Sequence, residues 1–255
     1  MTRPRVVVTR AREQADGLAN ELDAAGLDPV LVPTIAIELE PPGGELDRCA
    51  SNLGSYRWVV TSSANGARAI AAAIGRVDAD PEATRWAVIG PTTRGELEAA
   101  GIAVGFEPSH ALATALGAEL PIEPRDRILV VRGDLADEAL ALGLRDRGAD
   151  VDDVVAYRTR EAPESSRHLL RDAVTHGPIA AVAFTSGSTV RGLVALGRAE
   201  SIDVRSIPSV CIGPETADEA RAAGFRILAV PATPDAGALA ATSAIALAIR
   251  SEVTP

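Results

Sequence analysis

The sequence predicts an α/β protein made of two similar halves, and two observations carry this prediction. Short β-branched runs alternate with Ala- and Leu-rich amphipathic segments along the 255 residues, which is typical of strand–helix units in parallel sheets. The chain also contains a copy of itself. Arg10 matches Arg132, Ser62 matches Ser186 and Gly90 matches Gly213, each within the same short motif. The separation of the two copies along the chain is far too long for the repeat of a solenoid, and it fits the size of a small domain. We therefore expect two α/β halves with a site between them.

The expected elements follow from the apolar periodicity. Glycine follows four of the expected helices, where it adopts a left-handed conformation at little cost: Gly26, Gly101, Gly148 and Gly224. Strands are expected near 5–9, 29–32, 57–61, 86–89, 103–106, 127–131, 151–156, 179–184, 209–212 and 226–230. Helices are expected at 12–25, 64–74, 92–100, 111–119, 135–147, 165–175, 188–196, 215–223 and 235–250.

Two Pro-rich polar stretches, EPPGGE (40–45) and TREAPESS (159–166), interrupt this alternation at equivalent points of the repeat. Segments of this composition favour crossings between domains. Residues 1 to about 36 are therefore expected to fold apart from the segment that follows them.

Composition excludes several classes of function. All 25 basic residues are Arg, so no Schiff-base lysine and no phosphate-loop lysine exist. Pyridoxal-phosphate enzymes, class I aldolases and ordinary phosphate-loop NTPases are thereby excluded. The net charge of −10 argues against nucleic acid and anionic membranes as partners. No GxGxxG motif follows the first strand, so a dinucleotide fingerprint is missing.

The chain is expected to be cytoplasmic. Its first ten residues enter a strand pattern and show no signal peptide. Cys49 and Cys211 are too few for a disulfide framework or a metal cluster. The apolar run at 238–249 is too short to span a bilayer.

Polar residues follow six of the predicted strands. In parallel sheets the strand carboxyl ends and the helix N-termini form ligand sites, although Ser and Thr there often serve only as helix caps. Because the six groups pair across the repeat, they favour a wall of hydroxyls, amides and arginines suited to an anion with several carboxylates. The groups are Thr9-Arg10, Thr61-Ser62-Ser63, Gly90-Pro91-Thr92-Thr93, Arg132-Gly133-Asp134, Thr185-Ser186-Gly187-Ser188 and Gly213-Pro214-Glu215-Thr216.

Other candidates carry less information. The histidines at 110, 168 and 176 have no metal-ligand spacing and are expected at the surface or as caps. Tyr157 follows a predicted strand just before the second crossing point. It is either an ordinary strand residue or a phenol directed into the site.

Taken in order, these motifs resemble the uroporphyrinogen-III synthase family over nearly the whole chain. The resemblance rests on VVVTR, VPTIAI, WVVTSSANGARA, VIGPTTRGELEAAG, ILVVRGD, RDRGADVDDVVAYRT, AVAFTSGSTVRGL and VCIGPETADEARAAG. Two departures are mild, because neither removes a group assigned to chemistry: Gly187 stands where the family often has Pro, and Glu215 where it often has Thr or Ala.

The resemblance implies two Rossmann-like parallel-sheet domains, joined by a two-stranded linker and with a cleft between them. Domain 1 would combine 1–36 with 162–255, domain 2 would span 40–157, and the linker strands would be 37–39 and 158–161.

The implied reaction is that of a lyase in heme, siroheme and cobalamin biosynthesis. Hydroxymethylbilane, a linear tetrapyrrole, closes with inversion of ring D through a spiro intermediate, giving uroporphyrinogen III and water. No metal or cofactor is implied. The expected protein is a monomer that receives its substrate from hydroxymethylbilane synthase.

The resemblance also implies roles for particular residues. Tyr157 matches the functionally important tyrosine of the family and would help the hydroxyl leave. The substrate carboxylates would meet hydroxyls and arginines from the paired motifs: Arg10, Ser62, Ser63, Thr93, Arg132, Ser186, Ser188 and Thr216.

Two rival interpretations remain open at the level of the sequence. The same fold could serve as a non-catalytic tetrapyrrole-sensing or regulatory domain, against which the intact Tyr157, Thr93 and Thr216 argue. A bilobed small-molecule transferase is the other rival, and the missing nucleotide fingerprint counts against it.

Overall fold

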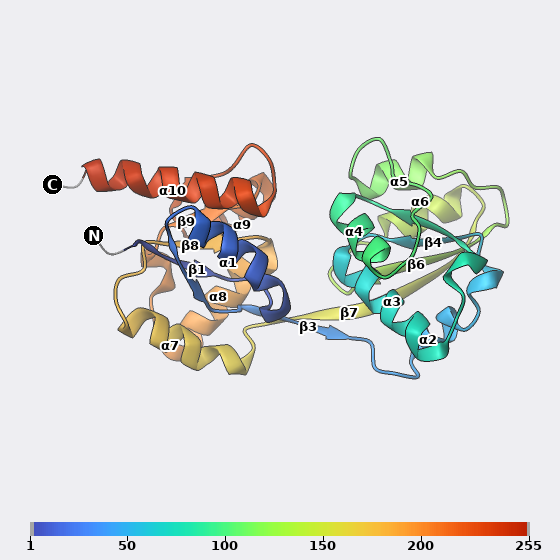
Figure 1. Cartoon of the computed structure of the whole chain (residues 1–255), viewed down its shortest axis with the longest axis horizontal. Coiled ribbons are helices and arrows are strands. Elements are labelled where there is room, and N and C mark those ends of the chain that lie inside the picture. Colours follow the sequence, from blue (N-terminus) through green and yellow to red (C-terminus); the bar gives the residue numbers. More distant parts are fainter. Residues whose placement is uncertain (1–2, 254–255) are drawn as a thin grey trace. The chain divides into compact units, whose positions relative to one another are not determined.

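The computed structural model describes residues 3–253, with side chains as far as residue 249. The chain forms two compact units. Unit 1 combines Met1–Ala36 with Arg160–Pro255, and unit 2 is continuous from Ile37 to Thr159. The chain therefore passes from one unit to the other twice, within strands β3 (Ile35–Leu39) and β7 (Asp150–Glu161) (Figure 1). The expected linker segments 37–39 and 158–161 lie within these two strands.

A parallel five-stranded sheet forms the centre of unit 1, with the strand order β10-β9-β8-β1-β2. Helices and strands alternate along most of the unit, as the sequence predicts. The strands are β1 (Arg5–Val8), β2 (Asp28–Leu31), β8 (Ala181–Phe184), β9 (Ser209–Cys211) and β10 (Ile227–Ala229). The helices are α1 (Ala15–Ala24), α7 (Arg167–Thr175), α8 (Gly187–Glu200), α9 (Pro214–Ala222) and α10 (Ala236–Val253).

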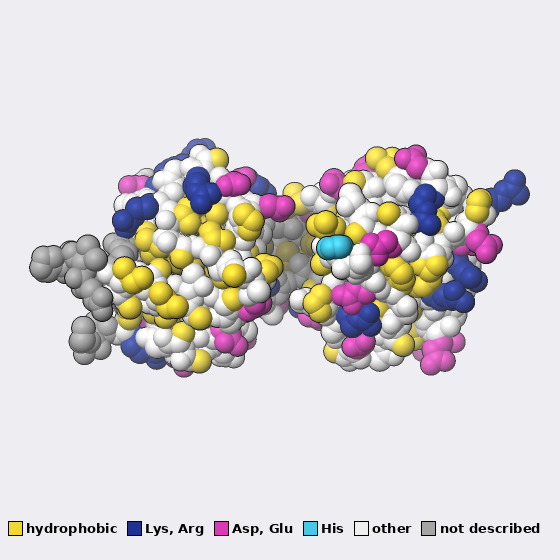
Figure 2. Space-filling model, turned by 90° about the horizontal axis from the view of Figure 1, so that it is seen from above, with side chains coloured by type: hydrophobic (Ala, Val, Ile, Leu, Met, Phe, Trp, Pro, Cys, Tyr) yellow, Lys and Arg dark blue, Asp and Glu magenta, His cyan; other side chains and the backbone are white. Residues whose placement is uncertain are grey.

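Both faces of this sheet are covered by helices, because successive strand residues point to opposite sides. Val6 and Val8 pack with α1 and α10 on one face, while Val7 packs with α7, α8 and α9 on the other. Helix α10 also presents apolar side chains to the surface (Figure 2), and Ile245 is 63% exposed. In the part of the chain that the structure describes, no helix combines the length and hydropathy of a membrane span.

Unit 2 has a second five-stranded sheet, with the strand order β3-β7-β6-β4-β5. Its helices again cover both faces: Val59 packs with α2, α3 and α4, and Val60 packs with α5 and α6. The other strands are β4 (Trp58–Thr61), β5 (Arg85–Val88) and β6 (Arg127–Gly133). The helices are α2 (Glu45–Ala50), α3 (Ala64–Val77), α4 (Pro91–Ala99), α5 (Ala113–Glu119) and α6 (Ala139–Asp146).

The sequence repeat maps strand by strand from one sheet to the other. Strands β9-β8-β1-β2 of unit 1 are neighbours in the same order as their repeat counterparts β5-β4-β6-β7 in unit 2. Each unit therefore takes the leading strand–helix–strand segment from one copy and the remaining strands from the other copy. For this reason, the boundaries of the two repeat copies do not coincide with the boundaries of the two units.

One expected element is wrong, and one observed helix was not expected. Residues 103–106 do not form a strand, and only Phe106 pairs with the sheet, through a single bridge to Ala87. Helix α2, a segment of six residues at 45–50, was not predicted. Such a short helix has little intrinsic stability and depends on tertiary packing. The four glycines expected after helices do adopt the left-handed region, with φ of 81°, 79°, 89° and 92°.

Candidate functional site

Unit 2 brings several of the predicted residues to the carboxyl ends of its strands. Ser62 and Ser63 follow β4, Thr93 lies in the first turn of α4 after β5, and Arg132 and Tyr157 lie near the ends of β6 and within β7. Since β4, β5, β6 and β7 pair in parallel, these positions share one edge of the sheet.

Tyr157 occupies a slot that the local backbone creates. Arg132 pairs with Val155, but Gly133 pairs with Tyr157, so the register shifts by one residue. Such a bulge redirects a strand side chain. A Cβ on Gly133 would lie 2.4 Å from Tyr157 Cζ and 2.6 Å from its hydroxyl oxygen. The ring therefore rests on the Gly133 backbone, in space that only glycine leaves open.

The Tyr157 hydroxyl contacts Ser63, whose Oγ lies 3.1 Å away. Ser63 is also the N-cap of α3, and its Oγ accepts a hydrogen bond from the Gly66 N–H at 3.1 Å. The phenol is thereby linked through one serine to the N-terminal turn of a helix, where the backbone carries partial positive charge.

Arg132 is held by a dense set of acceptors. Its Nε donates to Asp153 Oδ1 at 2.8 Å and its Nη1 donates to the Ala136 carbonyl at 3.0 Å. The side chains of Arg132 and Asp153 are only 12% and 9% exposed. The Asp153 carboxylate raises the pKa of Arg132, chiefly through their hydrogen bond. Arg132 thus anchors the segment after β6 as well as being a predicted substrate contact.

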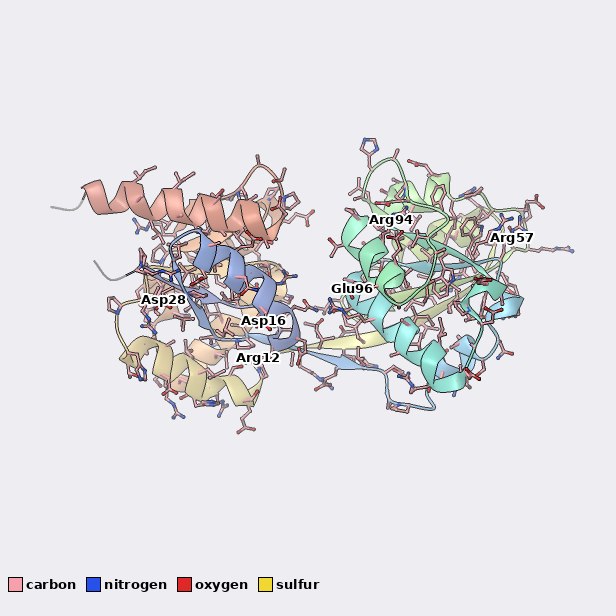
Figure 3. All side chains as sticks on the ribbon, in the orientation of Figure 1. Arg12, Asp16, Asp28, Arg57, Arg94 and Glu96 are labelled. Carbon is pink, nitrogen blue, oxygen red and sulfur yellow. The ribbon has the colours of Figure 1, made fainter. Side chains whose placement is uncertain are left out.

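Ser62 and Arg132 line a small cavity of about 50 Å³ beside α6. Thr93 is nearly buried, at 6% exposure, in the first turn of α4. Helix α4 carries Arg94 and Glu96 (Figure 3), and Glu96 pairs with Arg68 of α3 at 2.5 Å. This ion pair fixes the two helices whose N-termini flank the strand ends, and it lowers the pKa of Glu96.

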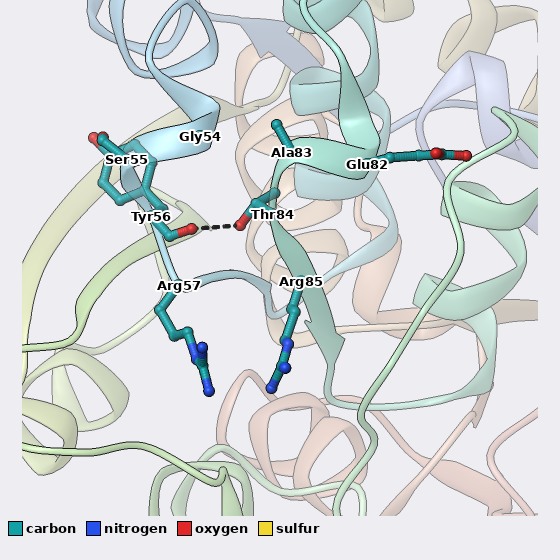
Figure 4. Close-up of a pocket in the computed structure, with 8 residues that line it drawn as sticks. All are labelled: Gly54, Ser55, Tyr56, Arg57, Glu82, Ala83, Thr84 and Arg85. Atoms are coloured by element: carbon teal, nitrogen blue, oxygen red, sulfur yellow. Dashed lines mark hydrogen bonds between the residues drawn. The ribbon is translucent and has the colours of Figure 1, made fainter.

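A larger and more polar cavity of about 390 Å³ lies at the opposite, amino-terminal end of β4 and β5 (Figure 4). Arg57 and Arg85 line it, and Thr84 Oγ1 donates to the Tyr56 carbonyl at 2.9 Å beside it. Ligands of parallel sheets bind at the carboxyl ends of strands, so this cavity is separate from the predicted site.

Unit 1 places the remaining predicted residues at the matching edge of its own sheet. Ser186 is the N-cap of α8 and forms a capping box with Thr189. Its Oγ lies 2.9 Å from Ser188 Oγ. Arg10 follows β1 and is partly buried, next to Thr9, whose hydroxyl donates to the Ala183 carbonyl at 2.7 Å.

Ser186 and Thr216 line a cavity of about 590 Å³ in unit 1. The first turns of α8 and α9 form its wall, so backbone N–H groups of both helices border the space. Glu215 and Glu219 also line it, and Glu219 pairs with Arg191 at 3.2 Å. The cavity combines anion-binding helix ends with two carboxylates.

The two IGP motifs have the same local geometry. Gly90 has φ −163° and ψ 175°, and Gly213 has φ −162° and ψ 172°; each is an N-cap followed by proline in the first turn. Thr93 and Thr216 occupy equivalent places after these caps and are 6% and 7% exposed. The structure therefore brings Ser63 into contact with Tyr157 in unit 2, and Ser186 beside Thr216 in unit 1.

Sequence reasoning did not identify two residues of this arrangement. Gly133 was noted only as part of a strand end, and Asp153 was not singled out. The only sequence signal for Gly133 is its position directly after ILVVR, since the bulge that pairs it with Tyr157 depends on the neighbouring strand. Asp153 lies in an acidic strand segment, and the register of the sheet decides that it pairs with Arg132.

The chemistry available here is that of hydroxyls, amides and charged side chains. Burial raises the pKa of Cys211 to about 11 and also raises the pKa of Cys49, so neither thiol is an activated nucleophile. Within the described residues, no three His, Cys, Asp or Glu side chains gather where they could hold a metal ion.

These features define a class: a two-unit parallel α/β protein with helix amides, hydroxyls and one tyrosine at the carboxyl ends of its strands. Residues 16–241 match the family model described as uroporphyrinogen-III synthase HemD. The chain belongs to the uroporphyrinogen-III synthase family.

Relatives and solved structures agree with this family. The chain is 28% identical over 231 residues to the uroporphyrinogen-III synthase of Synechococcus elongatus, covering 83% of each chain. It is 26% identical over 251 residues to that of Chlorobaculum parvum, covering 95% of this chain and 98% of the relative. It is also 26% identical to the porphyrin biosynthesis protein HemD of Ruminiclostridium josui, of whose length it spans 44%.

The fold is similar to solved structures of uroporphyrinogen III synthases. A Thermus thermophilus structure matches 96% of this chain and 99% of its own with a TM-score of 0.63 at 20% identity. A Helicobacter pylori structure matches 98% of this chain and 100% of its own with a TM-score of 0.62 at 14% identity. At these identities the likeness shows the fold, and the predicted two-domain parallel α/β class is confirmed.

Proposed function

We propose that this chain is a uroporphyrinogen-III synthase, a lyase that closes hydroxymethylbilane with inversion of ring D and releases water. The observation that carries the proposal is Tyr157, a phenol held beside a helix N-terminus at the carboxyl edge of the unit 2 sheet. Family membership over residues 16–241 supports the same reaction.

The first step of this reaction breaks the bond to the terminal hydroxyl of the substrate. Hydroxide is a poor leaving group, so a proton must reach its oxygen as the bond breaks. Tyr157 donates this proton, directly or through one ordered water, and the hydroxyl leaves as water. Tyr157 regains a proton when the newly closed macrocycle loses one, so the phenol is unchanged after each turnover.

The substrate is an anion with several carboxylates, whereas this protein has a net charge of −10. Attraction must therefore come from local donors and not from the overall charge. The helix N-termini of α3, α4, α8 and α9 supply amides, and the predicted hydroxyls and arginines supply the rest. Distributed contacts of this kind hold a flexible chain in the geometry for inverted closure.

Several finer properties belong to the same proposal. The protein acts in the cytoplasm as a monomer, receives its substrate from hydroxymethylbilane synthase and uses no cofactor. Its product feeds heme, siroheme or cobalamin synthesis. The absence of lysine is compatible with this assignment, because the mechanism needs no covalent amine chemistry.

The decisive experiment supplies freshly generated hydroxymethylbilane and separates the uroporphyrin isomers after oxidation. Isomer III in excess over the uncatalysed isomer I is the expected result. Only isomer I from folded protein would mean that the chain is a non-catalytic tetrapyrrole-sensing or regulatory domain.

Replacing Tyr157 with Phe tests the residue itself. The variant keeps the ring and loses the proton, so kcat should fall about 100-fold, as for the loss of a general acid, while KM changes little. Unimpaired turnover by Tyr157→Phe would rule out this role for the phenol.

A further inference from the structure

The Ser63 hydroxyl contacts two groups, the Gly66 N–H and the Tyr157 hydroxyl. Its Oγ accepts the Gly66 N–H at 3.1 Å, which leaves one lone pair and its own proton for other contacts. The Tyr157 hydroxyl lies 3.1 Å from the same oxygen. Either oxygen can donate at this distance, and accepting the Gly66 N–H strengthens Ser63 as a donor to the Tyr157 oxygen.

Gly133 limits the position of the same ring through its lack of a side chain. A methyl group at this position would lie 2.4–2.7 Å from three atoms of the phenol, well inside van der Waals contact. The backbone of Gly133 itself is outside the left-handed region, so alanine is compatible with its φ and ψ angles. What alanine would disturb is the position of Tyr157.

We propose that Ser63 and Gly133 are positioning residues for Tyr157: Gly133 provides the slot for the ring, and Ser63 donates to the phenol oxygen. This inference rests on the proposed function. Since Ser63 donates, the Tyr157 proton points away from Ser63 and toward the substrate. As the proton moves to the leaving hydroxyl, the phenolate oxygen keeps the Ser63 hydrogen bond, which strengthens because its acceptor is now charged. The role of Ser63 thus differs from the direct carboxylate contact expected from the sequence.

A double-mutant cycle tests whether Ser63 affects kcat through Tyr157. Ser63→Ala should lower kcat about fivefold, the effect of one lost neutral hydrogen bond, and Ser63→Thr should restore it. In the Tyr157→Phe background, Ser63→Ala should change kcat by less than about twofold, because the two residues act through one atom. Equal effects of Ser63→Ala in both backgrounds would overturn the positioning role.

Gly133→Ala tests the slot, with Gly143→Ala as its control. Gly143 lies in α6 of the same unit, and nothing lies within 4 Å of the position its Cβ would take. Gly133→Ala should lower kcat at least about tenfold while the control retains wild-type activity, since displacement of the ring removes most of its proton donation. Wild-type kcat in Gly133→Ala would overturn the slot. Thermal unfolding of both variants identifies any loss due to misfolding.

A spectroscopic measurement separates this inference from the proposed function. The chain has two tyrosines, so labelling tyrosine Cζ with ¹³C gives two resonances, and Tyr157→Phe assigns them. Ser63→Ala and Gly133→Ala should each shift the Tyr157 resonance, Ser63→Thr should restore it, and the Tyr56 resonance should stay in place. An unmoved Tyr157 resonance in both variants would overturn the inference. Tyr157→Phe could be fully active while the Tyr157 resonance still shifts in Ser63→Ala and Gly133→Ala. That result would support the positioning of the ring by Ser63 and Gly133, and only the catalytic role of Tyr157 would fail.

Discussion

Ser63 and Ser186 each serve the fold and the predicted site at the same time. Both are extended N-caps at the start of 14-residue helices, and both accept a hydrogen bond from the first helical turn. Removing an N-cap hydroxyl costs about 1 kcal/mol of stability. Loss of activity in variants of such residues must therefore be compared with their stability before a binding role is assigned.

Arg132 and Asp153 permit a direct test of whether a predicted site residue also stabilises the fold. Asp153→Ala leaves the Arg132 guanidinium in a largely buried place without its main partner. Breaking a buried pair in this way costs about 3–5 kcal/mol, which should lower the urea midpoint of unfolding clearly.

Asp150→Ala is the matched control on the same strand. Asp150 pairs with Arg127 at 3.8 Å, and its side chain is 70% exposed. An exposed pair contributes less than about 1 kcal/mol, so the midpoint should hardly move. Equal destabilisation by the two substitutions would show that the Arg132–Asp153 pair is not a special anchor.

Helix α2 shows how tertiary contacts decide an element. Asp47 of α2 is 7% exposed and forms an ion pair with Arg76 of α3, with Oδ1 2.5 Å from Nη2. The Gly43 N–H donates to the second carboxylate oxygen at 2.8 Å. These contacts hold the helix against its neighbour.

The pair predicts a specific dependence of stability on pH. The Arg76 hydrogen bond and then the Gly43 N–H lower the pKa of Asp47 in the folded protein below its ordinary value of 3.8. A lowered folded pKa means that the ionised form stabilises the fold above pH 3.8, and that this contribution is lost as the pH falls through the folded pKa.

Urea unfolding between pH 7 and pH 3 measures this contribution. Asp47→Asn should be less stable than wild type at pH 7, and the difference should shrink toward pH 3. Glu45→Gln, an exposed substitution in the same helix, should follow the wild-type curve. A constant difference between Asp47→Asn and wild type would contradict the prediction.

At the scale of the whole molecule, the two copies of the repeat exchange their leading segments. Strand β1 of the first copy lies between β8 and β2 in unit 1, and β6 of the second copy lies between β4 and β7 in unit 2. Unit 2 is nevertheless continuous in sequence, while unit 1 needs both chain segments.

This connectivity predicts different behaviour of fragments. A fragment of residues 37–159 should unfold cooperatively, since it contains both of its core clusters. A fragment of residues 160–255 should fail to fold, because β8 loses β1 and the cluster on one sheet face loses α1. Adding a peptide of residues 1–36 should restore structure. Circular dichroism and urea titration measure all three, and a stable isolated 160–255 fragment would contradict the prediction.

The sequence by itself determined the class of fold, most elements and the set of strand ends that carry polar residues. These features are local: apolar periodicity, glycine after helices and a proline in the first turn depend on neighbouring residues only. The family resemblance was confirmed for the same reason, because the motifs keep their order and spacing along the chain. The assigned roles of the site residues stay predictions.

Only the tertiary structure decided which of these residues meet. Phe106 makes a single bridge where a strand was expected, because pairing depends on the partner β5. The contact of Tyr157 with Ser63 joins residues 94 positions apart, and its slot at Gly133 depends on a bulge between two strands. Strand register is set by packing across the sheet, and a shift of one residue redirects a side chain to the other face. A linear sequence specifies the residues at the strand ends, but the register of β6 against β7 decides that the phenol meets Ser63.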